Sequence, residues 1–196
     1  PGSRTIAVFN KVRRAQDVYA HLEKLSGKKS GKPMLTLLHS RFRPDDRKMN
    51  LEKLLSSPGD GGTICIATQA IEAGVNVSCS LLVTDLAPWA SLVQRFGRCN
   101  RFGENESARI FWIAPDTKKR GWSVPYDEND LYRARDILNS LEGKSAAPAN
   151  LPEVTDAMRE DAVLRRKDVL ELFDTTSDLM GFDVDVSRFI RDSDDL

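Results

Sequence analysis

Short apolar runs rich in β-branched residues alternate along this chain with segments of helical periodicity. Parallel strands need crossover connections long enough to hold a helix, so this alternation predicts an α/β fold built on an open parallel sheet with helices on both faces. The runs expected as strands are residues 5–9, 34–39, 63–68, 80–85 and 108–114. Recurring apolar residues predict helices over residues 11–25 and 128–141, and Pro44, followed by two aspartates, marks the start of a further helix over residues 44–55.

The character of the chain changes after residue 114, and residues 145–152 are rich in Ala, Pro and Asn, as linkers often are. We therefore expect a domain over residues 4–144, followed by a linker and the start of a mainly helical, acidic accessory region over residues 145–196. A charged helix is expected from residue 153 to about residue 173. The opening residues 1–3, Pro-Gly-Ser, resemble the remnant of a cleaved tag.

The charges are balanced in total but divided along the chain. There are 29 basic and 29 acidic residues, yet positions 1–120 carry 20 basic and 11 acidic side chains, whereas positions 121–196 carry 9 basic and 18 acidic ones. The basic part suits a phosphate-bearing partner. No apolar run approaches the roughly 18 residues of a membrane span, so we expect a cytoplasmic protein with no membrane partner. The spacing of Cys65, Cys79 and Cys99 fits neither a disulfide framework nor a zinc site, which favours reduced thiols.

Polar side chains follow the predicted strands at the points where the strands end. They are Asn10 after the first run, Ser40 and Arg41 after the second, and Thr68 and Gln69 after the third. Because the carboxyl ends of parallel strands meet at one edge, where such sheets bind ligands, these groups should lie along the same edge. A hydroxyl and an amide beside the start of a short helix favour phosphate binding, although Thr68 alone is equally typical of an ordinary helix cap.

The densest group of candidate functional residues is the segment 94–101, Gln-Arg-Phe-Gly-Arg-Cys-Asn-Arg. Arg95, Arg98 and Arg101 lie three residues apart, so in a helix the last two would lie on neighbouring faces and could converge on one anion. Guanidinium groups match phosphoryl oxygens and stabilise the charge of phosphoryl transfer. The plainer alternative is a solvated basic face.

Taken together, residues 7–10, 68–74 and 94–101 resemble motifs IV, V and VI of the second RecA-like domain of superfamily 2 helicases. Residues 37–42 and 84–88, with 68–74, narrow the resemblance to the CRISPR-associated helicase-nuclease of type I interference. This resemblance implies a RecA-like fold and a parent that translocates on and unwinds DNA with ATP. It also implies that the parent is a single-stranded DNA nuclease.

The resemblance assigns expected roles residue by residue. Arg98 and Arg101 match the arginines that reach the γ-phosphate, and Gln94 matches the glutamine that senses it. Three further residues, Gly74, Asn76 and Arg95, are expected near the nucleotide. Five residues are expected to contact the nucleic-acid backbone: Asn10, Ser40, Arg41, Thr68 and Gln69. The family usually carries an acid where this chain has Asn76. An amide can still bond a ribose hydroxyl, but it cannot pair as a carboxylate would.

The implied cofactors are ATP and Mg²⁺, bound mainly by the first RecA-like domain of the parent, and no metal site is expected in this chain. The implied partners are single-stranded DNA, the first RecA-like and nuclease domains of the parent, and a CRISPR RNA-guided surveillance complex. Alone, the chain is expected neither to hydrolyse ATP nor to cut DNA. Alternatives are another superfamily 2 helicase, acting on DNA or RNA, and a non-catalytic RecA-like nucleic-acid-binding domain. A dinucleotide-binding oxidoreductase lacks support, because no Gly-x-Gly-x-x-Gly follows the first strand.

Overall fold

The computed structural model of this chain describes residues 2–27 and 31–153. The helix expected from residue 153 to about residue 173 lies outside these residues. The described elements, in chain order, are β1 (Arg4–Val8), α1 (Val12–Ser26), β2 (Met34–Leu38), α2 (Pro44–Leu55), β3 (Thr63–Ala67), the 3₁₀ helix η1 (Gln69–Ile71), β4 (Leu81–Asp85), α3 (Trp89–Phe96), β5 (Arg109–Ile113), α4 (Glu128–Leu141) and the 3₁₀ helix η2 (Pro148–Asn150).

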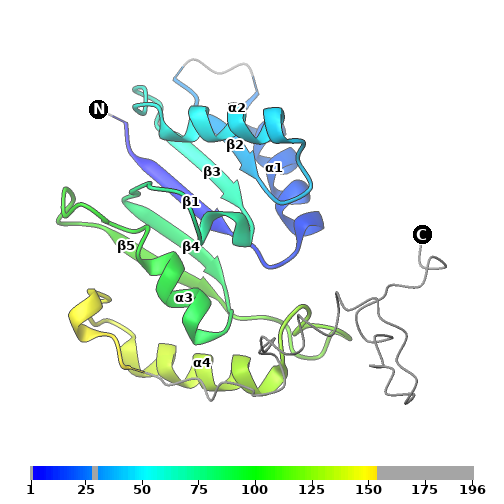
Figure 1. Cartoon of the computed structure of the whole chain (residues 1–196), viewed down its shortest axis with the longest axis vertical. Helices are drawn as coiled ribbons and strands as arrows, with labels where there is room; N and C mark the ends of the chain where they lie inside the picture. Colours follow the sequence, from blue (N-terminus) through cyan, green and yellow to red (C-terminus); the bar gives the residue numbers. More distant parts are fainter. Residues whose placement is uncertain (1, 28–30, 154–196) are drawn as a thin grey trace, which may run out of the picture. The chain divides into compact units, whose positions relative to one another are not determined.

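The strands form one parallel sheet in the order β2-β3-β1-β4-β5 (Figure 1). In the central strand, Ile6 pairs with Cys65 of β3 and with Leu82 of β4. The apolar side chains form two clusters, one on each face: α1 packs over Phe9, Ala15 and Ile66 on the first face, while α2, α3 and α4 enclose the larger cluster on the second. The predicted α/β parallel sheet with helices on both faces is confirmed.

The predicted element boundaries differ from the observed ones by at most one residue. The helices over 44–55 and 128–141 have the predicted bounds, and α1 begins and ends one residue later than expected. The first three strands end one residue early, at Val8, Leu38 and Ala67. The N–H groups of Phe9 and Thr68 still donate to the carbonyls of Ala67 and Leu38, at 2.9 and 3.0 Å, so the backbone pairing of the sheet stops at these residues.

The topology creates a crevice at the carboxyl ends of β1 and β4. The connection from β1 passes through α1 on one face, whereas the connection from β4 passes through α3 on the other. The two connections therefore lead away from each other, and neither of them covers the space between the two strand tips. This edge of the sheet is therefore where a ligand is best accommodated.

Residues 145–153 pack against the sheet domain. Ala146 and Leu151 contact the larger apolar cluster, and the indole Nε1 of Trp89 donates a hydrogen bond to the carbonyl of Pro152 at 3.2 Å. Although this segment has the composition of a linker, its side chains extend the compact unit beyond residue 145. The predicted division of the chain near 145 stays a prediction.

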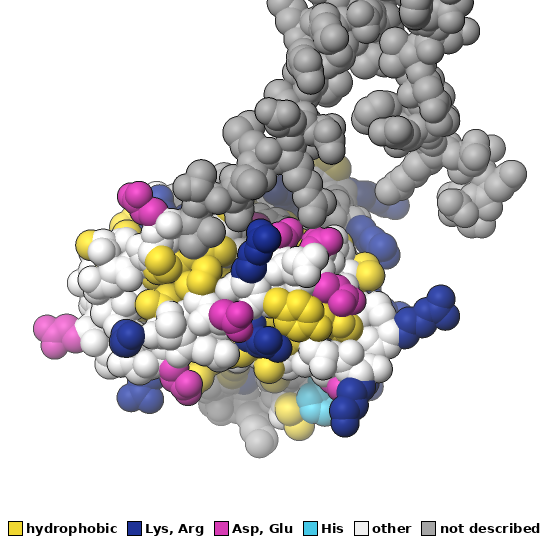
Figure 2. All heavy atoms as spheres, turned by 90° about the horizontal axis from the view of Figure 1, so that it is seen from below, with side chains coloured by type: hydrophobic (Ala, Val, Ile, Leu, Met, Phe, Trp, Pro, Cys, Tyr) yellow, Lys and Arg dark blue, Asp and Glu magenta, His cyan; other side chains and the backbone are white. Residues whose placement is uncertain are grey.

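The outer side of α4 carries a mixture of side chains. Figure 2 views the domain from the side on which α4 lies and shows acidic, basic and apolar groups interspersed there. No helix within the described ranges is long and apolar enough to cross a membrane. All three cysteines are free, and Cys79 and Cys99 face each other in an isolated parallel bridge.

Candidate nucleotide and nucleic-acid interface

The arginine segment begins inside α3 and continues beyond it. Trp89, Leu92 and Phe96 recur at spacings of three and four and are buried against the sheet, which fixes the orientation of the helix. The helix ends at Phe96, and the N–H of Gly97 donates to the carbonyl of Val93 at 3.0 Å. Arg98 and Arg101 therefore lie in the turns after the helix and not on its faces, in contrast to the helical arrangement considered from their spacing.

Arg95 is fully buried and forms an ion pair with Glu72. Its Nε donates to Glu72 Oε1 at 2.9 Å, and its Nη2 lies 2.8 Å from the same oxygen. The Nη1 atom donates to Thr84 Oγ1 at 2.8 Å and to the carbonyl of Asp85 at 3.2 Å. A buried guanidinium of this kind is stable only because its charge is paired and its donors are bonded.

The same guanidinium extends the network to the ends of β1 and β3. Its Nη2 also donates to Asn10 Oδ1 at 3.1 Å and to the Tyr126 hydroxyl at 3.3 Å. Gln69 Nε2 donates to that hydroxyl at 3.0 Å and to the Asn10 carbonyl at 3.1 Å. Arg95, which we predict to lie near the nucleotide, ties three predicted site segments together and has no exposed donor of its own.

Arg98 fastens the arginine segment to the turn that follows β3. Its side chain is buried, with Nε donating to the Ile71 carbonyl at 3.1 Å and Nη2 to the Glu72 carbonyl at 2.7 Å. Burial, and secondarily the nearby charge of Arg101, lowers the pKa of the Arg98 guanidinium. Its Nη1 atom makes no hydrogen bond within the described residues.

Arg101 is exposed and contacts the residue at which the family pattern is broken. Its Nε donates to Asn76 Oδ1 at 2.9 Å, and its Nη1 donates to the Gly97 carbonyl at 3.2 Å. The Nη2 atom has no partner in the described part of the chain. Gly74, with a φ of +72°, makes the left-handed turn that leads to Asn76, a conformation that glycine adopts at little cost.

Gln94 lies in the last turn of α3 and is exposed, with no side-chain hydrogen bond to any described residue.

Two of the predicted nucleotide contacts, Gly74 and Asn76, lie on the same surface as Arg101. Arg98 lies beside them with one nitrogen unbonded. The structure brings these four together and places Arg95 beneath them in the interior.

The residues predicted to contact nucleic acid lie at the carboxyl edge of the sheet, as expected, but they differ in their exposure and in their hydrogen bonds. Ser40 and Arg41 are exposed at the end of β2. Thr68 is 2% exposed, and its hydroxyl forms no hydrogen bond within the described ranges. The amide nitrogen of Asn10 donates to the Leu86 carbonyl at 2.7 Å, and that of Gln69 is bonded as described above.

Sequence reasoning did not assign roles to the acceptors of this network. Glu72 and Thr84 lie inside segments that resemble family motifs, so their positions were visible, but nothing in the sequence indicated their pairing with Arg95. Asp85 also lies at a strand tip. Tyr126 comes from a segment after β5 that has no motif, and only the folded chain brings it to Arg95.

No group of three or more His, Cys, Asp or Glu side chains in residues 2–27 and 31–153 could hold a metal ion.

The fold and the docked arginine segment define a class, the RecA-like α/β domain. Residues 1–104 match the family model described as CRISPR-associated nuclease/helicase Cas3, C-terminal, and the chain belongs to this family.

Known relatives agree with this assignment. The CRISPR-associated helicase Cas3 of Thermoproteus tenax is 32% identical over 177 residues, which cover 87% of this chain and 28% of the relative. The crystal structure of T. fusca Cas3-AMPPNP superposes with a TM-score of 0.63 at 25% identity, over 72% of this chain and 18% of that one. A chain of a CRISPR RNA-guided surveillance complex, pre-nicking, superposes with a TM-score of 0.59 at 27% identity, over 77% and 20%. This chain thus spans less than a third of the length of these relatives.

Proposed function

We propose that this chain is the second RecA-like half of an ATP-driven motor, whose parent translocates on and unwinds DNA in type I CRISPR interference and also cleaves single-stranded DNA. The observation that carries the proposal is the docking of residues 94–101 on residues 68–76. Arg98 and Arg101 make this contact, and each keeps one terminal nitrogen unbonded within the described residues. Two neighbouring guanidinium groups suit the oxygens of a phosphate.

In this proposal, ATP and Mg²⁺ are held mainly by the first RecA-like domain of the parent, and this chain completes the site from the opposite side. Arg98 and Arg101 approach the γ-phosphate, and Gln94 senses it. Gly74 allows the backbone to come close, and the Asn76 amide bonds a ribose hydroxyl. Arg95 acts as a positioning residue, because its donors are all used to hold the segments on which the contacting residues lie.

Nucleic acid is proposed to bind along the carboxyl edge of the sheet. Ser40 and Arg41 are exposed there, and the Thr68 hydroxyl lies in the same row of strand ends. Asn10 and Gln69 keep the row in place through their hydrogen bonds to the Leu86 carbonyl and the Tyr126 hydroxyl. Contacts of this kind to phosphates position a strand without reading its bases.

The proposed partners are single-stranded DNA, the first RecA-like and nuclease domains of the parent, and an RNA-guided surveillance complex. The last is supported by the similar chain in the pre-nicking surveillance complex. The nuclease domain is supported by relatives whose names include nuclease as well as helicase, such as that of Haloferax volcanii.

The test is Arg101→Ala in the full-length parent. Because Arg101 is exposed, the fold should be retained, while ATP hydrolysis should fall by about 10³-fold or more, as for arginines that contact a transferring phosphoryl group. Affinity for single-stranded DNA should be largely unchanged. Arg133→Ala is the matched control, because Arg133 is an exposed arginine on α4 with no ion pair among the described residues. Unchanged ATP hydrolysis in the Arg101 variant would instead support a non-catalytic binding domain.

A further inference from the structure

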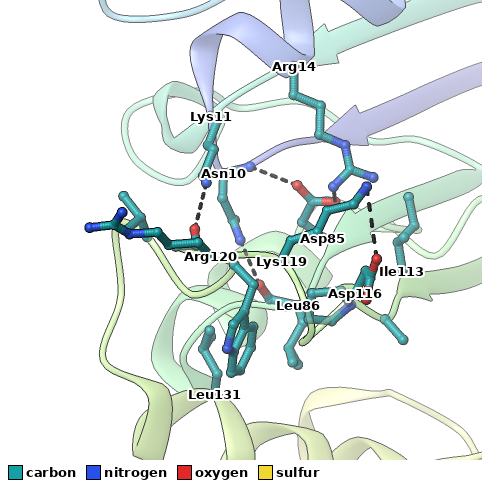
Figure 3. A pocket seen from close by; sticks show the side chains of 15 residues that line it. Asn10, Lys11, Arg14, Asp85, Leu86, Ile113, Asp116, Lys119, Arg120 and Leu131 are labelled. Atoms are coloured by element: carbon teal, nitrogen blue, oxygen red, sulfur yellow. Dashed lines mark hydrogen bonds and ion pairs between the residues drawn. The ribbon is translucent and has the colours of Figure 1, made fainter.

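A cavity of about 580 Å³ opens beside the row of strand ends, at the carboxyl ends of β1, β4 and β5 (Figure 3). Asn10, Lys11 and Arg14 line it from the end of β1 and the start of α1, and Asp85 and Leu86 line it from the end of β4. The remaining wall comes from residues 113–116, 119–122 and 124, and from Leu131 of α4. The cavity occupies the crevice between β1 and β4, where the crossover connections leave on opposite faces and where open α/β sheets bind ligands.

The charged groups that line this cavity are four cations and two carboxylates. Arg14 Nη1 lies 3.0 Å from Asp85 Oδ1, and Lys119 Nζ lies 3.9 Å from Asp116 Oδ2, so each carboxylate has a cation beside it. Burial raises the pKa of Asp85, although the Asn10 N–H and the neighbouring cations oppose this effect. The two pairs leave Lys11 and one further cation in excess.

The excess cations lie at the rim of the cavity. Lys11 Nζ donates only to the Gly121 carbonyl, at 2.9 Å. Arg120 forms no hydrogen bond or ion pair with any described residue, and its guanidinium extends away from the other cations (Figure 3). The cavity therefore has a net positive charge that the protein leaves uncompensated. An anionic ligand is the chemistry that this charge favours.

The volume of the cavity and the apolar part of its wall further restrict the class of ligand. A volume of this size lies within the range of about 300–1,000 Å³ typical of sites for small organic ligands. Leu86, Pro115 and the half-buried Trp122 supply apolar surface beside the cations. A ligand with a flat apolar part and a phosphate matches such a wall, because bases pack on aromatic and apolar side chains while phosphates bind Lys and Arg.

We propose that this cavity holds one nucleotide of a single-stranded nucleic acid, with backbone phosphates at Lys11 and Arg120, the two cations without a carboxylate partner, and the base against the apolar wall at Trp122. The inference rests on the proposed function, because it extends the proposed path from Ser40 and Arg41 along the strand ends to the end of β5. A strand is favoured over a free mononucleotide because the uncompensated cations lie at the open rim, where a backbone enters and leaves.

The test compares two double variants of the 196-residue chain that remove the same charge. Lys11→Ala/Arg120→Ala removes the two cations of the cavity that have no carboxylate partner, and both side chains are exposed. Lys24→Ala/Lys53→Ala is the control: both lysines are exposed and lie in the last turns of α1 and α2, at the opposite edge of the sheet. Binding of a fluorescein-labelled single-stranded oligothymidylate is followed by anisotropy over a salt series, and circular dichroism checks the fold of each variant.

We expect the rim variant to bind the oligonucleotide about five- to tenfold more weakly at low salt. The slope of log affinity against log salt should fall by about 1.4, or about 0.7 for each phosphate that the variant no longer neutralises, while the control keeps the slope of the unmodified chain. An affinity and slope equal to those of the control would overturn the inference and leave the proposed function standing. Displacement of the oligonucleotide by an equal concentration of thymidine monophosphate would overturn it in favour of a mononucleotide site. If the unmodified chain fails to bind single strands at all, the inference fails together with the proposed nucleic-acid path along the strand ends, whereas the proposed ATP site keeps its own test in the Arg101 variant.

Discussion

Arg98 and Arg101 are equivalent in the family pattern but differ in their burial and in their contribution to the fold. Arg98 is buried and bonded to two main-chain carbonyls, whereas Arg101 is exposed. Arg98→Ala should lower the free energy of unfolding by about 1.5–3 kcal/mol, because the carbonyls of Ile71 and Glu72 lose charged donors in a buried place. Arg101→Ala should change it by less than about 0.5 kcal/mol, as surface substitutions usually do.

Urea unfolding of the 196-residue chain measures this difference, with Arg133→Ala as the surface reference. Equal decreases in stability for the two arginine variants would show that the Arg98 hydrogen bonds do not stabilise the fold. The comparison also matters for the ATPase test, since Arg98→Ala confounds a chemical role with a structural one. Arg101→Ala is therefore the cleaner probe.

The sequence could predict that these arginines matter but not what each does. A spacing of three residues is typical of one face of a helix. In the structure, however, α3 ends at Phe96, and the two later arginines donate hydrogen bonds to residues 71–76. Burial of Arg95 depends on acceptors from four separate segments, among them Asn10 and Tyr126. Such a convergence is set by tertiary packing, and no local pattern reports it. In the same way, Cys79 and Cys99 are distant in sequence, but their backbones form an isolated β-bridge in the fold.

At the scale of elements, the ion pair between Arg95 and Glu72 ties α3 to the turn that follows η1. Arg95→Met should lower the free energy of unfolding by about 3–5 kcal/mol, because it leaves a largely buried carboxylate without its cation. Arg95→Met/Glu72→Met should be more stable than Arg95→Met by at least about 1 kcal/mol, since the uncompensated charge is then gone. Chemical unfolding of the single and double variants measures both values. Decreases that simply add would mean that the pair is not coupled.

Element boundaries were predictable because they follow from local periodicity and turn residues. Pro44 marks the first residue of α2, and Asp127 caps α4 by accepting a hydrogen bond from the Asn129 N–H at 2.9 Å. The segment between β5 and α4 carries no such signal. It supplies Tyr126 to the buried network and Lys119 and Arg120 to the cavity, roles that depend on where β5 ends relative to β1 and β4.

For the whole molecule, the charges are also distributed unevenly in space within the described domain. The outer side of α4 mixes acidic and basic groups (Figure 2), while the cavity at the carboxyl edge retains an uncompensated positive charge. We therefore propose that phosphate binds at the carboxyl edge of the sheet and not on the outer side of α4. Charges elsewhere in the chain should change the affinity for nucleic acid mainly through long-range electrostatic interactions, which salt screens.

Removal of the acidic end of the chain tests this view. Residues 154–196 carry 6 basic and 12 acidic side chains, so a chain ending at residue 153 keeps 23 basic and 17 acidic ones. The cut belongs after residue 153 and not at 145, because Ala146 and Leu151 pack on the core and the Pro152 carbonyl accepts a hydrogen bond from Trp89. The shortened chain should bind single-stranded DNA about tenfold more tightly at low salt, and the gain should vanish near 0.5 M salt, where charges are screened beyond a few ångströms. Anisotropy titrations of both chains over a salt series measure this effect. Equal affinities at low salt would mean that the acidic end does not oppose nucleic-acid binding.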